Sequence, residues 1–413
     1  MACESIYDAR LPINGRSIAL YKLAKWKNGM AFKKADFSST GLPIIKIAEL
    51  NGGISDSTAW TEGDYGKDVF LTKGDYVFSW SGNPETSIDI FRYNLQDGWL
   101  NQHIFKVTPE TSLVREEYFF FLMKWLKPVF KKIAANKQTT GLGHVTLADL
   151  KRIQVTIPSF EVQERIERIL CPLDFKIRLN NQLNDYLEQL LMTSQRKISE
   201  VEALTSVRAD EAFDIHIGKT PPRKESEWFS PNSNNNVVWM SIKDMGCGDV
   251  YLMDSSEYLT QKAVAKHNMK LCKPGSVLLS FKLTIGRVGI VSKEMTTNEA
   301  IACFSSDDPR KLAYLYPLLK SYDYASLGST SSIATAVNSK MIKSMLLRMP
   351  STSVLDQFYE QTKPLYEMLQ NKVKENVSLT ALRDVLLPKL MSGEIDVSKV
   401  DLTQLTNNHL ADC

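Results

Sequence analysis

The sequence predicts a mixed α/β (α+β) protein made of two copies of one plan in tandem, each copy being a globular domain followed by a long helix. Three observations lead to this prediction. Residues recur at a constant spacing between the two halves, strand patterns alternate with turn residues in both halves, and an apolar 3–4 spacing follows in the helical segment. A length of 413 residues suits two domains.

The duplication is clearest where residues recur 192 positions apart, as in 350 minus 158 and 389 minus 197. The residues of the first half are Pro158, Pro172, Asn184, Leu187, Leu190 and Lys197. Their partners are Pro350, Pro364, Asn376, Leu379, Leu382 and Lys389. Chance rarely matches such different residue types in one unbroken register. We therefore interpret the two halves as a tandem duplication.

Upstream of this segment the two halves also match, but the offset drifts. Residues 44–50 match 239–245 at an offset of 195, residues 73–75 match 274–276 at 201, and residues 101–102 match 298–299 at 197. A drifting offset indicates loops that accept insertions, whereas the constant offset indicates helices that keep their length.

The variable part of each half carries strand and turn patterns. Residues 76–80, 277–281 and 288–291 are apolar runs that predict strands, and residues 81–84 and 282–287 have turn chemistry, with Gly286 in the second turn. Trp80 and Trp239 are expected in the core rather than stacked on a ligand. These parts are predicted to be mixed α/β globules.

The helical part of each half begins with a capping signal. Thr146 with Asp149, and Asn338 in the second half, predict short helices that end at Pro158 and Pro350. In the following segment, apolar residues form a 3–4 seam that is interrupted by a polar step at Asn180 and Asn184. The seam residues are Ile166, Leu170, Leu173, Ile177, Leu187 and Leu191.

The seam predicts a coiled-coil face, and the alternative is a helix packed only on its own domain. Pro172 and Pro364 predict a kink or a late helix start, which leaves a rod of roughly 40 Å up to Lys197 or Lys389 at about 1.5 Å per residue.

Composition narrows the class of protein. Hydrophobic residues make up 43% and charged residues 23% of the chain, as in globular proteins, and the formal net charge of +3 decides nothing about partners. Six cysteines without a metal-ligand spacing predict a reducing cytoplasm and no metal site. The apolar stretch 118–130 contains Lys124 and Lys127, so we expect no membrane span and no membrane partner.

The sequence contains no pattern typical of an active site. Residues 218–220 imitate the end of a phosphate-binding loop, but position 213 is Phe and prolines follow directly. Neither an amine-methyltransferase motif nor a glycine-rich cofactor loop is found. Asp-x-Lys triplets at 149–151 and 174–176 fall on predicted helices without a companion acid, and the five histidines are scattered. We therefore expect a chain without a catalytic centre.

Several motifs together resemble the type I restriction-modification specificity subunit family. They are residues 218–221, 239–244, 274–275, 285–287 and 297–299, and above all 386–395, whose Leu-Leu-Pro-Lys-Leu-Met-Ser-Gly-Glu-Ile is similar to the family's C-terminal signature. The resemblance covers nearly the whole chain. The first half matches loosely, because Pro84 interrupts its turn and residues 138–143 differ from 330–335.

The resemblance implies a non-catalytic, sequence-specific subunit that binds double-stranded DNA, two methyltransferase subunits and restriction (translocase/nuclease) subunits. It would recognise a bipartite asymmetric site and direct adenine methylation and cleavage by those partners. S-adenosylmethionine is expected on the methyltransferase partner, and no cofactor in this chain. A tandem duplicate whose two long helices pair as an antiparallel coiled coil gains approximate two-fold symmetry. Its target recognition domains then reach points about 34 Å apart on one face of a duplex, with an unread spacer set by the helices.

The resulting organisation has five parts. Residues 1–158 and 201–350 are the two target recognition domains, residues 159–200 and 351–399 are the spacer helices, and residues 400–413 form a tail. DNA contact is expected from polar residues on loops. The candidates are Lys282, Thr284, Arg287, Ser329, Thr330, Ser331 and Ser332, and in the first half Ser81, Asn83, Gln138, Thr139 and Thr140. Helix packing is expected from Ile166, Leu173, Ile177, Leu187, Leu365, Leu369, Leu379 and Leu386.

Two other functions fit parts of the pattern. A helical scaffold or adaptor could use the same long helices without recognising DNA, and it would show no salt-dependent DNA binding. A divergent DNA-modifying enzyme would methylate or cleave DNA as the purified chain alone. The missing catalytic motifs weigh against the enzyme.

Overall fold

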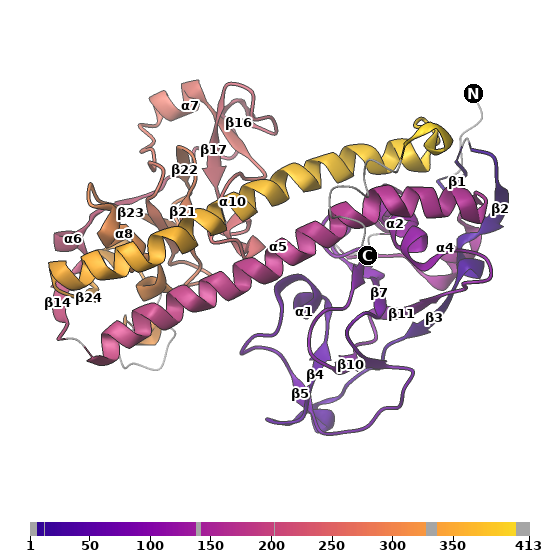
Figure 1. Cartoon of the computed structure of the whole chain (residues 1–413), viewed down its shortest axis with the longest axis horizontal. Coiled ribbons are helices and arrows are strands. Elements are labelled where there is room, and N and C mark those ends of the chain that lie inside the picture. Colours follow the sequence, from indigo (N-terminus) through magenta and orange to yellow (C-terminus); the bar gives the residue numbers. More distant parts are fainter. Residues whose placement is uncertain (1–5, 12, 138–141, 202, 328–336, 402–413) are drawn as a thin grey trace. The chain divides into compact units, whose positions relative to one another are not determined.

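The chain folds into two compact units, which are described here one at a time. The structure is a computed structural model that describes residues 6–11, 13–137, 142–201, 203–327 and 337–401. Unit 1 comprises Met1–Lys176 and Leu379–Cys413, and unit 2 comprises Ile177–Ser378. Each unit contains strands, short helices, and part of each of two long helices, α5 (Phe160–Val201) and α10 (Thr352–Met391) (Figure 1).

Unit 1 contains three sheets of three or four strands and one two-stranded sheet. In sheet order these are β1 (Asp8–Ala9), β13 (Gln154–Ile157) and β2 (Arg16–Ala19); β3 (Ala24–Asn28), β11 (Ile104–Pro109), β7 (Tyr76–Ser79) and β9 (Asp89–Arg92); β5 (Trp60–Thr61), β4 (Leu42–Ile45), β10 (Gly98–Leu100) and β6 (Phe70–Leu71); and β12 (Gly143–His144) and β8 (Ser81–Gly82). Its short helices are η1 (Leu20–Leu23), η2 (Lys34–Asp36), α1 (Ile47–Gly52), α2 (Glu116–Trp125), α3 (Lys127–Ala135), α4 (Leu147–Arg152) and η6 (Val397–Lys399).

Unit 2 contains a two-stranded, a five-stranded and a four-stranded sheet. In sheet order these are β14 (Thr205–Arg208) and β24 (Leu346–Met349); β15 (Asp214–Ile217), β23 (Ile301–Ser305), β20 (Val277–Ser280), β21 (Val288–Val291) and β18 (Tyr251–Leu252); and β16 (Phe229–Ser230), β19 (Tyr258–Thr260), β17 (Asn236–Met240) and β22 (Met295–Thr297). Its short helices are α6 (Ala209–Ala212), η3 (Ser226–Trp228), η4 (Asp244–Cys247), α7 (Gln261–Lys266), α8 (Pro309–Lys320), η5 (Tyr324–Leu327) and α9 (Ser339–Ser344).

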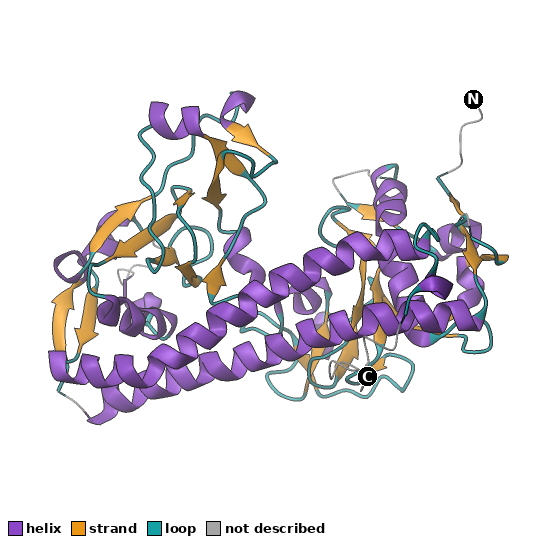
Figure 2. Ribbon diagram, turned by 45° about the horizontal axis from the view of Figure 1, so that its top comes forward, coloured by secondary structure: helices purple, strands orange, loops and turns teal. Residues whose placement is uncertain are grey.

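The two units repeat the same strand arrangement. The order β3-β11-β7-β9 in unit 1 corresponds to β15-β23-β20-β21 in unit 2, and the parallel pair β4–β10 corresponds to β17–β22. Figure 2 shows strands and short helices next to the long helices in both units. This shared topology confirms the predicted fold class of two mixed α/β domains in tandem.

The strands lie close to where the sequence predicts them. β21 occupies the predicted residues 288–291, whereas β7 and β20 each end one residue earlier, at Ser79 and Ser280. All the residues of β20 and β21 are buried, which explains why these strands are continuous apolar runs instead of alternating patterns.

The predicted caps are present, but the predicted ends of the short helices are wrong. Thr146 and Asp149 form a capping box on α4, and Asn338 Oδ1 accepts hydrogen bonds from two backbone amides of α9. Both helices then end after six residues, at Arg152 and Ser344. The segments up to the prolines are instead strands β13 and β24, which pair with β2 and β14.

The long helices begin within one residue of the predicted spacer segments 159–200 and 351–399, and not late, at the prolines. α5 runs unbroken from Phe160 through Pro172, and α10 begins at Thr352, ahead of Pro364. The prediction of a late start at the prolines is therefore wrong. A proline inside a helix removes one backbone hydrogen bond, but Ile166 and Leu170 are fully buried and packing holds this part of α5 helical.

The two long helices pair in an antiparallel sense. In unit 1 the beginning of α5, with Ile166 and Leu170, shares a core with Leu390 and Met391 at the end of α10. In unit 2 the end of α5, with Leu187 and Leu191, shares a core with the first half of α10. The predicted antiparallel coiled coil is confirmed. Among the described residues no helix is long and apolar enough to span a membrane.

Candidate nucleic-acid interface and helix pair

The loop between β20 and β21 is fastened to its own strand by Ser280. The buried Ser280 hydroxyl donates a hydrogen bond to the carbonyl oxygen of Thr284 (2.6 Å) and accepts one from the backbone amide of Arg287 (3.0 Å). The amide of Gly286 donates to the Ser280 carbonyl (3.0 Å). These hydrogen bonds hold the residues between them as a fixed protrusion.

Lys282, Leu283 and Thr284 form the exposed tip of this loop. Leu283 is 101% exposed and has a φ of 61°, a left-handed conformation that costs an ordinary L-residue of order 1 to 3 kcal/mol. Ile285 is also exposed. A leucine that is both strained and fully in solvent gives the fold no packing energy, so its place at the tip suits contact with another molecule. Leu283 is not among the contact residues predicted from the sequence.

Arg287 lies on the inner side of the loop. Its Nη1 donates a hydrogen bond to the carbonyl oxygen of Ile242 (2.5 Å), and a Cβ added to Gly246 would lie 2.6 Å from the same nitrogen. The guanidinium is therefore packed against the backbone between β17 and η4. Of the three residues predicted in this loop, Lys282 and Thr284 are exposed and Arg287 is partly buried.

The matching loop of unit 1 follows β7. Ser81 is buried in strand β8, opposite His144 of β12. Asn83 is exposed, and its Oδ1 and carbonyl oxygen accept hydrogen bonds from the amides of Glu85 (2.9 Å) and Ser87 (2.8 Å). Asn83 is thus presented on a closed turn, whereas Ser81 belongs to the sheet.

The two tryptophans beside these loops pack into the protein interior. Trp239 is buried, as predicted, and its Nε1 donates to the carbonyl oxygen of Lys219 (3.1 Å). Trp80 is partly buried, stacks on Phe105 and donates to the side chain of Asn28 (3.0 Å). The remaining predicted contact residues lie outside the described residues; they are Gln138, Thr139, Thr140, Ser329, Thr330, Ser331 and Ser332.

The predicted helix-packing residues all lie on α5 and α10. Ile166, Leu187 and Leu369 are buried. The others are partly buried, namely Leu173, Ile177, Leu365, Leu379 and Leu386.

The polar step of the seam is where the helices of unit 2 exchange side-chain hydrogen bonds. Asn180 Nδ2 donates to Glu375 (3.0 Å) and to Asn376 Oδ1 (2.9 Å), and Asn376 Nδ2 donates to Asn181 (2.6 Å). Asn184, one helical turn on, is buried with no hydrogen-bond partner for either amide atom among the described residues. A polar position in an apolar seam fixes the register of a helix pair.

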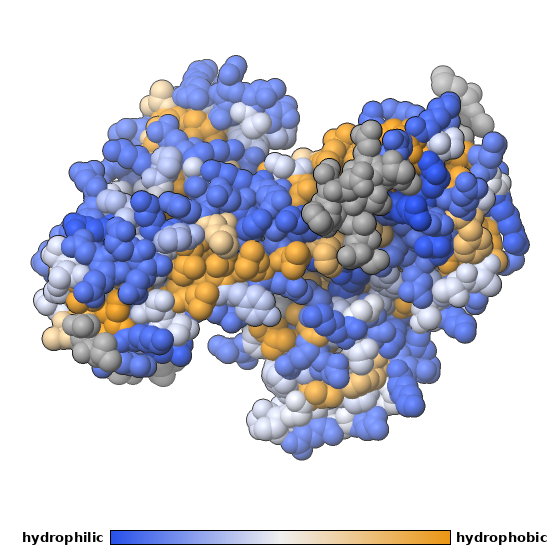
Figure 3. All heavy atoms as spheres, viewed as in Figure 1, coloured by the Kyte–Doolittle hydropathy of each residue, from blue (hydrophilic) through white to orange (hydrophobic). Residues whose placement is uncertain are grey.

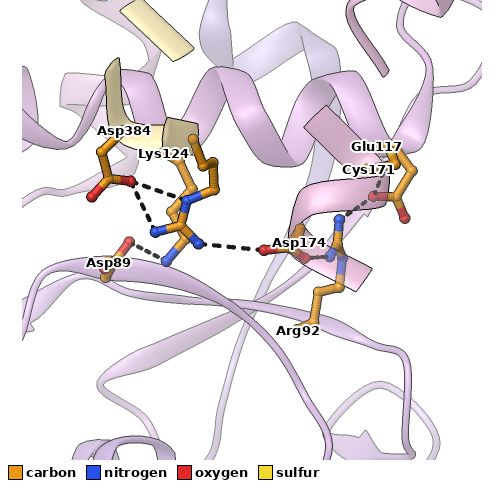
Figure 4. Close-up of polar contacts among 8 residues, drawn as sticks. Asp89, Arg92, Glu117, Lys124, Cys171, Asp174 and Asp384 are labelled. Carbon is orange, nitrogen blue, oxygen red and sulfur yellow. Dashed lines mark hydrogen bonds and ion pairs between the residues drawn. The ribbon is translucent and has the colours of Figure 1, made fainter. Parts of the chain in front are cut away.

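In unit 1 a charge network joins the sheet to the helices (Figure 4). Arg92 of β9 forms ion pairs with Glu117 of α2 and with Asp174 of α5. Arg383 of α10 lies 3.5 Å from the other oxygen of Asp174. Arg92 also lies over the ring of Phe120, 4.0 Å from its centroid. One buried arginine therefore links a strand and two helices.

A second apolar row on α5 remains exposed. Phe175, Leu179, Tyr186 and Leu190 are 39%, 45%, 64% and 52% exposed. Their spacing of four, seven and four residues places them along one side of the helix. On α10, Val377, Leu382 and Val385 are exposed as well. Figure 3 shows apolar surface following the long helices.

The comparisons with known proteins point to one family. Residues 17–189 match the family model described as the type I restriction modification DNA specificity domain. The type I restriction enzyme HindI specificity subunit of Haemophilus influenzae is 23% identical over 407 aligned residues, which cover 79% of this chain and 87% of that relative. Residues 17–189 thus match the type I restriction modification DNA specificity domain, and the chain is similar to type I restriction enzyme specificity subunits over most of its length. The MjaIX specificity subunit of Methanocaldococcus jannaschii is also 23% identical, with 73% of each chain covered.

Solved structures of type I specificity subunits resemble the chain at low similarity. The S subunit from M. genitalium is 14% identical with a TM-score of 0.46, covering 92% of this chain and 98% of that one. The HsdS subunit from Thermoanaerobacter tengcongensis is 17% identical with a TM-score of 0.32, covering 93% and 98%.

The residues of the rejected catalytic patterns have structural partners. Lys219, from the imitation phosphate loop, donates to the carbonyl oxygens of His267 and Asn268. Asp149 caps α4, and Asp174 pairs with Arg92. Each polar group is thus accounted for by packing or capping in its own unit.

Proposed function

We propose that the chain is the sequence-specific DNA-binding subunit of a type I restriction-modification complex. Residues 1–158 and 201–350 would each read one half of the target. Residues 159–200 and 351–399 would space the two domains, with residues 400–413 as a tail. The observation that supports this most strongly is the repeated strand order, which gives each unit a loop at the same place after β7 or β20.

The two loops differ in sequence, so the target is asymmetric. Residues 282–285 read Lys-Leu-Thr-Ile, whereas residues 81–84 read Ser-Gly-Asn-Pro. Side chains distinguish base pairs in the major groove by the hydrogen-bond donors, acceptors and methyl groups that the base edges present. Two different loops, one in each unit, therefore read two different half-sites, and the bases between the half-sites remain unread.

Within the second half-site we assign different roles to the loop residues. Lys282 contacts a phosphate, Thr284 contacts a base edge, and Leu283 contacts the methyl group of a thymine. Arg287 positions the loop, because its guanidinium is already bound to the Ile242 carbonyl. In the first half-site Asn83 occupies the matching position, with Ser81 supporting it. The polar residues 138–140 and 329–332 complete the candidates.

The exposed apolar row of α5 supports a surface for partner subunits. Water-exposed apolar side chains in a continuous row are typical of protein interfaces. We assign the row formed by Phe175, Leu179, Tyr186 and Leu190 to the methyltransferase subunits, two of which bind the complex. The restriction subunits join for cleavage. Adenine methylation, with S-adenosylmethionine as methyl donor, and cleavage are carried out by the partners, and this chain contributes no catalytic group.

Exchange of one domain tests the proposal. Residues 201–350 are replaced by the equivalent region of a family member with a different target, and methylated adenines are mapped in DNA exposed to the hybrid and the methyltransferase subunits. One half-site should change while the other is retained. An unchanged target would reject the scheme. A protein-only scaffold predicts no salt-dependent DNA binding by the complex, and a divergent enzyme predicts methylation or cleavage by the chain alone.

A further inference from the structure

Three side chains that commonly bind metal ions meet in the interior of unit 2. They are His216, Cys272 and Cys303, and all three are buried. One ligand atom of each, the imidazole nitrogen and the two thiol sulfurs, lies within 4.8 Å of the others. Both cysteines are free thiols.

The strands bring these residues together from distant parts of the sequence. His216 on β15 lies directly opposite Cys303 on β23 in the antiparallel register of the five-stranded sheet. Cys272 precedes β20 and forms an isolated bridge with Met295, the first residue of β22 in the four-stranded sheet. The cluster therefore lies where two sheets of the same unit meet.

The spacing of the cluster suits tetrahedral coordination. Cys272 Sγ lies 3.5 Å from His216 Nε2. A tetrahedral zinc ion with Zn–S of about 2.3 Å and Zn–N of about 2.05 Å holds its sulfur and nitrogen ligands about 3.6 Å apart. A bound ion would thus require little movement of these two side chains.

A polar hydroxyl next to the cluster and an access route from solvent are also present. The Thr297 hydroxyl lies against the Cys272 thiol and has no hydrogen-bond partner among the described residues. Its oxygen, or a water molecule, could complete the coordination of a metal. His216 also lines an open cavity of about 680 Å³, so an ion can reach the cluster from solvent.

We propose that unit 2 binds one Zn²⁺ ion through Cys272, Cys303 and His216. Thiolate and imidazole ligands favour zinc over the harder ions Mg²⁺ and Ca²⁺. The ion would be structural, because it would tie the five-stranded sheet to the four-stranded sheet around a small core that contains only 11 buried residues. β20, which follows Cys272, carries the loop with Lys282 and Leu283 at its tip.

The competing explanation is that the two cysteines are ordinary buried thiols. Free cysteine packs well as a small apolar residue. This explanation accounts for the burial of the thiols and for the hydrogen bond between Cys272 Sγ and His216 Nε2 (3.5 Å), but it leaves the buried Thr297 hydroxyl without a hydrogen-bond partner among the described residues. A metal ion accounts for all four groups.

Metal content of the full chain tests the proposal. The reduced protein is equilibrated with Zn²⁺, freed of excess ion and analysed by mass spectrometry of the elements. One Zn²⁺ per chain is expected. Replacement with Co²⁺ should give a sulfur-to-cobalt charge-transfer band, which reports thiolate ligation independently of any activity. Cys303→Ala and His216→Ala should each weaken Zn²⁺ binding on the order of 100-fold or more.

Matched variants separate loss of a ligand from loss of the fold. Cys171→Ser removes a thiol in unit 1 and should leave the zinc content and the cobalt band unchanged. Circular dichroism of each variant verifies folding. The zinc content and the cobalt band are also measured on the wild-type protein, so the test does not depend on whether a variant folds. The proposal is overturned by less than a stoichiometric amount of zinc in the reduced wild-type protein, by zinc binding that survives in the Cys272→Ala/Cys303→Ala double variant, or by a Cys272–Cys303 disulfide in place of the metal.

Discussion

Arg92 on strand β9 forms an ion pair with Asp174 on helix α5, and the side chains of both are only 12% exposed. Removing Arg92 takes away the ion pairs of both Asp174 and Glu117 at a site with little access to water, while Arg383 stays 3.5 Å from Asp174. Arg92→Met should therefore lower the free energy of unfolding of unit 1 by about 3 to 5 kcal/mol. The double variant Arg92→Met/Asp174→Leu should lose less, since it leaves neither of these two charges alone. Urea unfolding of the three proteins measures both effects.

The control for this prediction is the exposed pair of Lys27 and Asp68 in the same unit, whose side chains are 57% and 73% exposed. Lys27→Ala should leave stability nearly unchanged, because water screens the interaction. Equal losses in Lys27→Ala and Arg92→Met would contradict the special role of Arg92.

The two seam asparagines should respond in opposite directions to replacement by leucine. Asn184→Leu removes two unsatisfied amide atoms from the seam and should stabilise unit 2 by about 1 kcal/mol. Asn180→Leu breaks hydrogen bonds to Glu375 and Asn376 and should cost about 1 to 2 kcal/mol. Thermal unfolding of the two variants gives the comparison, and a shift of the same sign in both would be inconsistent with this hydrogen-bond pattern.

Asp149 should make the free energy of unfolding of unit 1 decrease at acidic pH. Burial raises the pKa of Asp149, but hydrogen bonds from Lys137, Thr146 and Tyr7 lower the pKa by more than burial raises it. The pKa of Asp149 therefore lies below its usual value of 3.8. A lowered pKa stabilises the fold above about pH 3.8, and this contribution disappears as the pH falls through the pKa of the folded state.

Asp149→Asn should accordingly cost about 2 kcal/mol at pH 7, since hydrogen bonds to a charged group are lost. The difference in unfolding free energy between Asp149→Asn and the wild-type protein should become smaller below about pH 3.8. Unfolding free energies measured between pH 7 and pH 3 follow this trend, and Asp56→Asn at an exposed site serves as the control. A difference that stays constant with pH would show that the carboxylate charge is not responsible.

Lys282→Ala should weaken DNA binding by the assembled complex to a similar degree for matched and mismatched sites. Loss of one phosphate contact should reduce the slope of log affinity against log salt by about 0.9. Lys293→Ala, beyond the opposite end of β21, is the matched control and should leave the slope unchanged. Leu283→Ala should instead reduce discrimination at one thymine. Fluorescence anisotropy at several salt concentrations separates these outcomes.

The exposed row of α5 should matter for assembly rather than for folding. Leu179→Glu and Leu190→Glu place charges on an apolar interface, so each should weaken binding to the methyltransferase subunits at least about tenfold while circular dichroism stays unchanged. Gln189→Glu, on the same helix, is the control. Size-exclusion chromatography of the mixed subunits measures assembly, and normal complex formation by both leucine variants would exclude this row as the interface.

Sequence patterns predicted the fold where the signal is local. The buried strand 288–291 is an apolar run bounded by a turn, and Asn338 caps a helix through its own side chain. The helix ends at Arg152 and Ser344 were missed because the prolines that follow are conspicuous, whereas strands β13 and β24 depend on pairing with β2 and β14. Pro172 suggested a break that the packing of neighbouring residues overrides.

For the candidate sites too, the residues with a local sequence signal could be predicted, and those that depend on tertiary contacts could not. Lys282 and Thr284 could be selected because a turn between two strands is visible in the sequence. Leu283 could not, because its exposure depends on the hydrogen bonds that close the loop. His216, Cys272 and Cys303 lie 56 and 31 positions apart, so their sequence spacing predicts no metal site and only the strand register brings them together.

Unit 1 is assembled from two separate stretches of chain, since residues 379–401 complete what residues 6–176 begin. Arg165 donates hydrogen bonds to the carbonyl oxygens of Val397 and Val400, and Leu390 and Met391 fill the core beside Ile166. During synthesis, unit 2 is therefore the first to have all its residues outside the ribosome. The core of unit 1 stays partly exposed until the end of α10 emerges from the ribosome.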